Sequence, residues 1–302
     1  MTKEEEFKNN MLKLAWKENY FDNRILDITH YTSTEGLAGI LNSGVLWATR
    51  FDVLNDTTER KDAKYLYDKV VGELAQHDSF YNKFKDIEPC DNYGWLFDRH
   101  ETIKFQSIKK PEVFVISFSK NPDCQSLWNC YVKNDKKQGY ALNFQKKDFN
   151  YYDHEPGFDI KCFDLIYNDE EKINIIKKIL QEIKDIYVDD EDCLKFAKAC
   201  IGELLFVWQD LFKNHHFCDE REHRILIVQD QKNRKFPIKY RVNGGLIVPY
   251  IEFPFNDFIK LVAVTCGPLN NDDKSQDLTQ EYLHSQGYGN VSVKKSTIPI
   301  RY

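Results

Sequence analysis

The chain has 302 residues, of which 42% are hydrophobic and 30% are charged, a composition typical of globular proteins and not of disordered or membrane-spanning ones. The formal net charge is −6 at pH 7, which argues against a protein that coats nucleic acid with its whole surface but leaves room for a local basic patch. The start of the chain is acidic and polar, and no apolar run approaches the roughly 18–20 residues of a membrane helix. We therefore expect a cytoplasmic protein without membrane contact.

Eight cysteines are scattered along the chain, and no two of them form a Cys-x-x-Cys pair. A zinc site favours such close pairs, because one loop can then present two thiolates to the same ion. We therefore expect buried free thiols, as in a reducing compartment, and no metal.

Hydrophobic periodicity divides the chain into short strands and amphipathic helices. The strongest strand is VFVISFS, rich in β-branched and aromatic residues, and residues 78–110 form the least regular segment. In chain order, we expect a helix at 1–20, a strand at 24–33, a helix at 35–43, a strand at 45–50, a helix at 58–76, a strand at 113–119, a short helix within 121–133, strands at 139–144 and 158–167, helices at 170–187 and 191–214, strands at 223–228, 245–253 and 261–268, a helix at 278–288 and a strand at 291–301.

The order of these elements also predicts the fold class. Helices interrupt the strands at irregular intervals, which favours an α+β fold over a doubly wound sheet. No internal repeat and no Pro/Gly/Ser-rich linker divides the chain. We expect an N-terminal helix at 1–23 and a single domain at 24–302, with helical insertions near 58–110 and 170–214.

Several standard motifs are absent from the sequence. It contains no GxxxxGK[ST], GxGxxG, GxSxG or HExxH, so phosphate-loop, dinucleotide-fold, hydrolase and zincin readings have no support. We expect Gly244-Gly245 to form a turn between strands and not a phosphate cradle.

Polar residues gather where the expected strand 24–33 ends. ITHYTS places the imidazole of His30 and several hydroxyls just before the N-terminus of a helix, where free backbone N–H groups suit anionic or polyhydroxyl ligands. The alternative is a histidine packed on a neighbouring strand, with its ring nitrogens bonded to backbone carbonyls. A single histidine does not decide between the two.

Two further strand ends carry polar side chains. Alternation places Ser117 and Ser119 on one face of their strand and Phe118 on the other. DEREHR opens the strand 223–228 and places Glu220 and Glu222 two residues apart, so that one carboxylate could bind ribose hydroxyls and the other could orient or deprotonate a nucleophile. The alternative is a charged loop in water.

The pattern LND-x-x-E supplies further polar residues after the expected strand 45–50. Asn55, Asp56 and Glu59 fit an Asx turn that caps the next helix. Alternatively, Asn55 or Asp56 lines a cleft.

Taken together, HYTSTEGLAGILNSGVLWAT, LND-x-x-E, VFVISFSKNPD, LWNCY, DEREHR, CGP and STIPIR resemble a large uncharacterised bacterial family of unknown function. The resemblance runs from about residue 24 to the C-terminus. That family in turn resembles the ADP-ribosyltransferase superfamily. The superfamily's order is a strand with His or Arg, a helix ending in Gly, a strand with Ser-x-Ser or Tyr, and a strand with Glu. The corresponding positions here are His30, Gly44, Ser117/Ser119 and Glu220/Glu222.

The resemblance implies a split pair of small β-sheets around a cleft, and NAD⁺ as substrate, with no metal. In that reading Glu222 stabilises the developing oxocarbenium ion and Glu220 activates the acceptor. His30 is placed with these catalytic residues and also bonds the ribose on the adenosine side. The residues that would bind NAD⁺ are His30, Tyr31, Thr32, Ser117, Phe118 and Ser119, with Tyr31 or Phe118 stacking on a flat ring.

The sequence departs from the superfamily at its second motif, where Ser-Phe-Ser replaces the usual Tyr or Ser-Thr-Ser. The alternative function is therefore a non-catalytic module that binds a nucleotide or peptide in the same cleft. In the enzymatic reading, the chain is a bacterial toxin or phage-defence effector, and an antitoxin could silence it.

The segment KNRKFPIKYR concentrates positive charge in an otherwise acidic chain. It follows the strand that carries Glu222, so we expect it near the rim of the cleft. Cations beside aromatic rings suit a single-stranded RNA or DNA acceptor, with Arg234 and Lys235 as its contacts. The alternatives are a hairpin tip in water and a protein acceptor.

Overall fold

The strand expected at VFVISFS lies at the centre of the molecule. The computed structural model describes residues 2–17, 26–54, 59–90, 111–131, 139–146, 158–270 and 274–299. The VFVISFS segment belongs to strand β3 (Pro111–Ser119). This strand lies in the middle of a mixed α/β structure with a sheet of ten strands. The other strands are β1 (Leu26–Ser33), β2 (Val45–Arg50), β4 (Gly139–Lys146), β5 (Phe158–Asp164), β6 (Glu222–Asp230), β7 (Lys239–Asn243), β8 (Leu246–Pro254), β9 (Ile259–Cys266) and β10 (Ser292–Lys295).

The sheet divides at β3. One edge of β3 pairs with β6 along its whole length, from Pro111 opposite Asp230 to Ser119 opposite Glu222. The other edge pairs with β2 at Phe114 and Val115, and with β1 at Ser119 alone. Two groups of strands, β1-β4-β9-β10 and β2-β8-β7, therefore diverge from the two ends of this edge. Separate small sheets were expected, whereas the structure shows one sheet, because β3 bonds to both groups.

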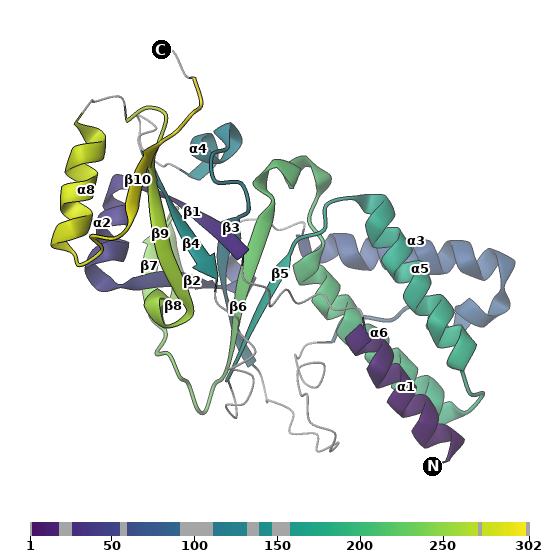
Figure 1. Cartoon of the computed structure of the whole chain (residues 1–302). Coiled ribbons are helices and arrows are strands. Elements are labelled where there is room, and N and C mark those ends of the chain that lie inside the picture. The colour runs from purple at the N-terminus through teal and green to yellow at the C-terminus, as the bar shows by residue number, and fades with distance from the viewer. Residues whose placement is uncertain are drawn as a thin grey trace.

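Eight α-helices and three short 3₁₀ helices lie in the described part of the chain. Figure 1 shows α1, α3, α5 and α6 together beyond β5 and β6, while α2 and α8 lie at the opposite end of the molecule. The helices are α1 (Lys3–Lys17), α2 (Thr34–Ser43), α3 (Glu59–His77), α4 (Gln125–Tyr131), α5 (Asp169–Ile186), α6 (Glu191–Leu211), α7 (Phe255–Phe258) and α8 (Ser275–Ser285), with η1 (Phe51–Val53), η2 (Ser79–Phe84) and η3 (His215–Glu220).

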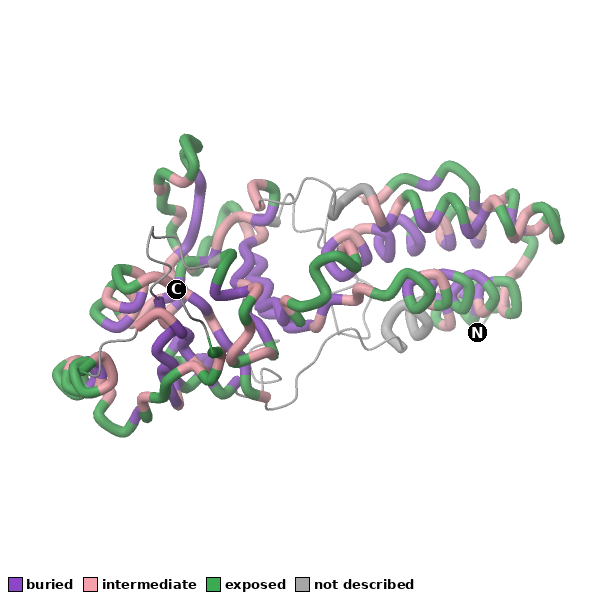
Figure 2. The backbone as a smooth tube through the Cα atoms, turned by 90° about the horizontal axis from the view of Figure 1, so that it is seen from above, coloured by how far each residue is buried: buried purple, intermediate pink, exposed green. Residues whose placement is uncertain are grey.

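Alternation along β3 and β6 separates two hydrophobic cores. Val115 and Leu226 face the helices, in a core that also holds Phe7 of α1. Phe114 and Ile225, one residue earlier on their strands, face the core on the other side of the sheet. Both faces of these central strands are therefore covered, and Figure 2 shows the buried residues running inside both halves of the molecule.

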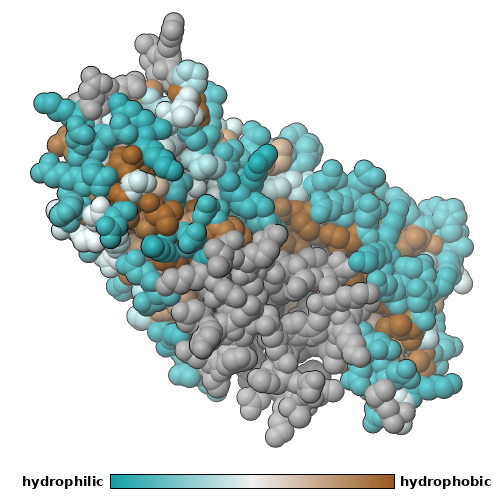
Figure 3. Space-filling model, in the orientation of Figure 1, coloured by the Kyte–Doolittle hydropathy of each residue, from teal (hydrophilic) through white to brown (hydrophobic). Residues whose placement is uncertain are grey.

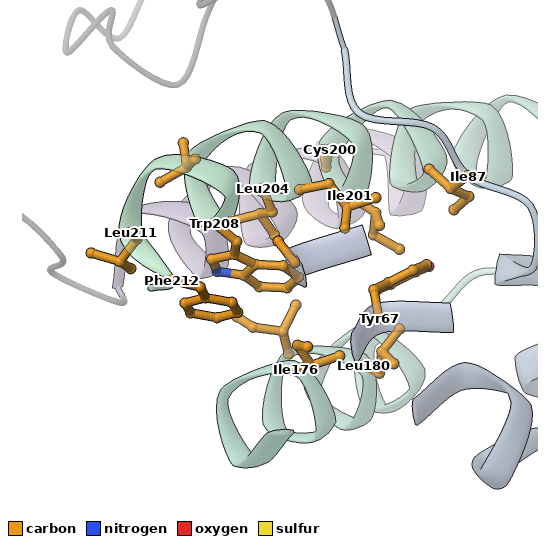
Figure 4. Packing of buried hydrophobic residues seen from close by; sticks show 14 of the residues in the cluster. Tyr67, Ile87, Ile176, Leu180, Cys200, Ile201, Leu204, Trp208, Leu211 and Phe212 are labelled. Atoms are coloured by element: carbon orange, nitrogen blue, oxygen red, sulfur yellow. The ribbon is translucent and has the colours of Figure 1, made fainter. Parts of the chain in front are cut away.

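The helical core explains why the N-terminal helix and the two helical insertions pack as one layer. Trp208 and Phe212 stack at 5.9 Å between ring centroids, and Figure 4 shows both directed toward Ile176, with Leu180 and Tyr67 nearby. The α1 helix contributes Phe7 and Met11 to this cluster. Apolar residues at helical spacing thus give α3, α5, α6 and α1 one shared buried seam.

At two points of the chain the residue types explain the local backbone conformation. The Ser33 side chain accepts a hydrogen bond from the backbone N–H of Gly36 and caps α2, which ends at Gly44 with φ of 68°, a left-handed conformation that suits glycine. Gly244 and Gly245 have φ of 57° and 83° and join β7 to β8, as a type I′ hairpin turn requires.

The last expected strand is shorter than predicted. Residues 291–301 read as a strand, but β10 covers Ser292–Lys295 alone. Beyond it, the carboxylate of Asp123 accepts hydrogen bonds from the Ser296 hydroxyl and from the backbone N–H of Thr297. The chain therefore leaves the sheet to bind the loop before α4.

Three other expectations concern the LND-x-x-E residues, the cysteines with metal binding, and membrane-spanning helices. Asn55 and Asp56 lie outside the described residues, as does the side chain of Glu59. All eight cysteines carry free thiols, but the expectation that they are buried is wrong for half of them, since only Cys162, Cys193, Cys200 and Cys266 are buried. The described residues include no cluster of side chains that could hold a metal ion. In the same part of the chain, no helix has the length and apolarity needed to cross a membrane. The surface in Figure 3 is mainly hydrophilic, with hydrophobic residues in separate patches.

Candidate functional site

A cavity of about 680 Å³ opens where β1 and β2 diverge from β3. Its wall is built from β1, β2, β3, β7, β8, the helix α2 and the turn from η3 into β6. Eight of the residues singled out in the sequence line it: His30, Tyr31, Thr32, Ser117, Phe118, Ser119, Glu220 and Glu222. Three stretches that are far apart in the sequence therefore meet at one cavity.

His30 lies in the wall formed by β1. Its Nδ1 is 3.3 Å from the backbone carbonyl oxygen of Ser117, and its ring contacts Phe118 edge-on. Because a carbonyl only accepts, Nδ1 carries the proton in the neutral ring and Nε2 keeps its lone pair. Burial lowers the pKa of His30, the bond to Ser117 opposes this, and the charge of Arg241 lowers it further. The ring is therefore a neutral hydrogen-bond acceptor at pH 7.

Tyr31 and Thr32 line the same cavity in different ways. The Tyr31 hydroxyl donates to the backbone oxygen of Asn121 and accepts from the backbone N–H of Cys124, and its ring packs edge-on against Trp128. Burial raises the pKa of this phenol. Its hydroxyl and ring thus hold the loop before α4, which leaves Thr32 as the more available of the two.

The Ser-Phe-Ser segment of β3 divides as the alternation predicts. Ser119 is buried, and its hydroxyl donates to the backbone oxygen of Glu220 and accepts from the N–H of Asn121. Phe118 is buried with its ring against His30 and Phe144. Ser119 therefore holds the turn into β6, and Ser117 is the half-buried serine that faces the cavity.

Glu222 is the first residue of β6 and is 4% exposed. Arg224 binds its carboxylate with Nε at 2.7 Å from Oε1 and Nη2 at 3.2 Å from Oε2. Lys213 Nζ lies 2.8 Å from Oε2 of Glu222 and 2.7 Å from Oε2 of Glu220. Burial by itself raises the pKa of Glu222, but these two cations outweigh it and lower the pKa to about 2.

The geometry of this pair departs from the expected one. Glu220 lies in η3 and not on the strand, and Arg221 between the two glutamates has φ of 40°, so the chain turns sharply before β6 begins. The common partner Lys213, and not a shared strand face, brings the two carboxylates together. A carboxylate has about four acceptor positions, of which the described residues use one on Oε1 and two on Oε2. One acceptor position on Glu222 Oε1 therefore has no partner among the described residues.

Arg234 and Lys235 lie outside the wall of the cavity. Arg234 Nη2 and Nε bind Glu112 at 2.6 and 2.7 Å, and Lys235 Nζ lies 4.3 Å above the Phe158 ring. The segment that carries them does reach the cavity, through Arg241.

Three side chains important to the site were not singled out from the sequence. Lys213 and Arg224 fix Glu222, and Arg241 was counted only as part of a basic patch. Alternation along β6 could have placed Arg224 on the face of Glu222. Lys213 follows α6 and meets Glu222 only through the tertiary fold.

The comparisons with known proteins cover part of this chain. Residues 127–225 match the model of a family described as "Protein of unknown function (DUF2971)". No curated protein and no solved structure matches the chain. The matched range begins in α4 and ends in β6, and it includes Lys213, Glu220, Glu222 and Arg224. The sequence of these residues thus supports the expected resemblance to an uncharacterised family.

Proposed function

We propose that the cavity binds NAD⁺ and that the protein transfers ADP-ribose from it to an acceptor. The observation that carries this proposal is that Glu222, His30 and Ser117 all line one cavity, to which they bring a carboxylate, an imidazole and a hydroxyl. A volume of about 680 Å³ lies in the range of small-molecule and cofactor sites.

Transfer of ADP-ribose from NAD⁺ requires a carboxylate that is ionised at neutral pH. Transfer breaks the bond between nicotinamide nitrogen and C1′, and the electron pair leaves with the nicotinamide. C1′ then has oxocarbenium character, until an acceptor nucleophile bonds to it and loses its proton. With a pKa of about 2, Glu222 is negative throughout the neutral range. Its open Oε1 position can accept the ribose 2′-hydroxyl and stabilise the positive charge on the ring.

The other residues have supporting roles in this proposal. His30 Nε2 accepts a hydrogen bond from a hydroxyl of the adenosine-side ribose. Ser117 binds the part of NAD⁺ that leads from this ribose to the nicotinamide ribose. Glu220, held by Lys213, is the candidate that orients or deprotonates the acceptor. The acceptor is proposed to be a single-stranded nucleic acid or a protein.

A second function is favoured by the ion pairs of Glu222. Lys213 and Arg224 neutralise much of the negative charge that an oxocarbenium ion would need. A cavity that binds a nucleotide without breaking it would have the same His30 and Ser117, and the glutamate would then be structural.

The two functions are separated by measuring nicotinamide release and binding in parallel. Purified protein is mixed with NAD⁺ and cell lysate, nicotinamide is quantified by mass spectrometry, and NAD⁺ affinity is measured by calorimetry. Glu222→Gln should abolish release. Glu112→Gln is the matched control, because Glu112 is also held by an arginine fork but lies outside the cavity, and it should release nicotinamide at the wild-type rate.

Each outcome decides one question. Binding of NAD⁺ without release would support the non-catalytic module and reject the transferase. Release that persists in Glu222→Gln would show that another residue stabilises the transition state. No affinity for NAD⁺ would reject the transferase and would leave a module that binds a different ligand.

A further inference from the structure

Arg241 holds an unusual position in the cavity wall, on the side formed by β2, β7 and β8. Its guanidinium carbon lies 5.1 Å from the ring centroid of Trp47 and 5.6 Å from that of Tyr250. Nη2 donates to the Thr49 hydroxyl at 2.7 Å. Nε is buried and has no hydrogen-bond partner among the described residues. Two rings and a hydroxyl therefore fix the plane of the guanidinium, and part of its hydration is lost without replacement.

Among the described residues of the cavity wall, each carboxylate has partners other than Arg241. The carboxylates of Glu220 and Glu222 in the wall are paired with Lys213, and that of Glu252 is paired with Lys239 at 2.6 Å. Glu35 lies in the first turn of α2, where its own backbone N–H and the Ser33 hydroxyl lower the pKa of its carboxyl. Within the described wall, Arg241 is thus a cation without a carboxylate partner.

Arg241 also lies close enough to His30 to affect its charge. The guanidinium is one of the groups that lower the pKa of His30. Burial lowers the pKa of Arg241 itself, but an arginine stays protonated in proteins. A fixed positive charge therefore faces the same hollow as the hydroxyl-binding atoms of His30 and Ser117.

We propose that Arg241, held by Trp47, Tyr250 and Thr49, binds the phosphate oxygens of a nucleotide in this cavity. A phosphate supplies the missing negative charge and matches the planar donors of a guanidinium. The sugar hydroxyls of the same ligand would then meet His30 and Ser117, which small carboxylates could not do. The choice of a nucleotide rests on the proposed function, whereas the requirement for an oxyanion rests on Arg241 alone.

The test is calorimetric titration of the full chain with three probes: ADP, adenosine and inorganic pyrophosphate. Wild-type protein should bind ADP at least about 10-fold more tightly than adenosine. Arg241→Gln should weaken ADP binding by about 10- to 100-fold, abolish pyrophosphate binding and leave adenosine unchanged. Arg241→Lys should lose part of the affinity, because it keeps the charge and lacks the fork. Arg234→Gln is the matched control, since its fork binds Glu112 outside the cavity, and it should bind ADP, adenosine and pyrophosphate with wild-type affinity.

The results separate this subsite from the proposed function. Equal affinity for ADP and adenosine, no binding of any phosphate-bearing probe, or the same loss in Arg234→Gln and Arg241→Gln would overturn it. Thermal melting checks that the variants fold. Should Arg241→Gln fail to fold, the Arg241→Lys result and the wild-type ratio of ADP to adenosine decide the question. ADP binding through Arg241 without nicotinamide release would reject the transferase and keep the subsite. Nicotinamide release together with equal affinity for ADP and adenosine would keep the transferase and reject the phosphate subsite.

Discussion

Glu222 offers a prediction of stability that does not depend on its proposed role in catalysis. The carboxylate is buried and bound by Arg224 and Lys213. Replacing it with Gln keeps the shape but leaves two buried cations without their counter-ion. We expect Glu222→Gln to destabilise the fold substantially, although the two side chains are nearly equal in size and shape.

The magnitude follows from the pKa of Glu222. A lowering from 4.5 to about 2 corresponds to about 3 kcal/mol of stability at neutral pH, similar to the 3–5 kcal/mol that breaking a buried ion pair typically costs, by rough estimate. Because the folded pKa lies below the unfolded one, this stability is fully present above about pH 5 and is lost as the pH falls toward 2.

Urea unfolding followed by circular dichroism at pH 7 and pH 3.5 measures both effects. At pH 7, Glu222→Gln should lose about 3 kcal/mol, whereas the control Glu112→Gln should lose less, about 1 kcal/mol, because its partner Arg234 is 41% exposed. The gap between wild type and Glu222→Gln should narrow at pH 3.5. A loss below about 0.5 kcal/mol, or one equal at both pH values, would refute the electrostatic reasoning.

Three further predictions concern the core, the cavity and the basic segment. Trp208→Ala should lower the free energy of unfolding in urea by about 3–5 kcal/mol, since the ring is fully buried. Trp47→Ala, at a 49% exposed site, should lower it by about 1 kcal/mol or less. Equal losses in the two variants would contradict the packing described. NAD⁺ affinity should stay constant from pH 8 to about 6.5 and fall in more acid solution, because protonation of His30 removes its Nε2 acceptor. His30→Gln should remove this fall in affinity. In the wild type, a midpoint of the fall above about pH 6.5 would count against a lowered pKa of His30. Single-stranded RNA binding should weaken with salt, and replacing Arg234 and Lys235 together with Gln should flatten that slope. Undetectable RNA binding at low salt would favour a protein acceptor.

Local patterns predicted most of the elements because their causes are local. The β-branched run of β3 and the helical spacing of α6 each reflect which side chains are buried, and burial repeats with the period of the element. The same logic correctly separated Ser117 from Phe118. It overextended β10, because the attraction of Asp123 for Thr297 depends on two segments far apart in the sequence.

The candidate site was predictable in its residues but not in its electrostatics. His30, Ser117 and Glu222 stand out as polar side chains at strand ends, and the fold brings them to one cavity. The partners of Glu222 could not be deduced in the same way. Lys213 reaches it from the end of α6, and no spacing rule links those positions. In the sequence, Arg241 is one of several cations in the basic segment. What sets it apart is that no carboxylate in the described cavity wall pairs with it, and this depends on the fold.

The backbone around Lys213 ties the ammonium group to the helical layer. Its N–H donates to the oxygen of Ile166, and its carbonyl accepts a hydrogen bond from Lys172 of α5. The distance between Lys213 Nζ and the carboxylate of Glu222 is therefore set by how α5 and α6 pack, several residues away from any ligand. A substitution that shrinks this packing would withdraw the ammonium group and leave Glu222 with a higher affinity for protons. The protonation of Glu222 in acid solution would then depend on the packing between α5 and α6.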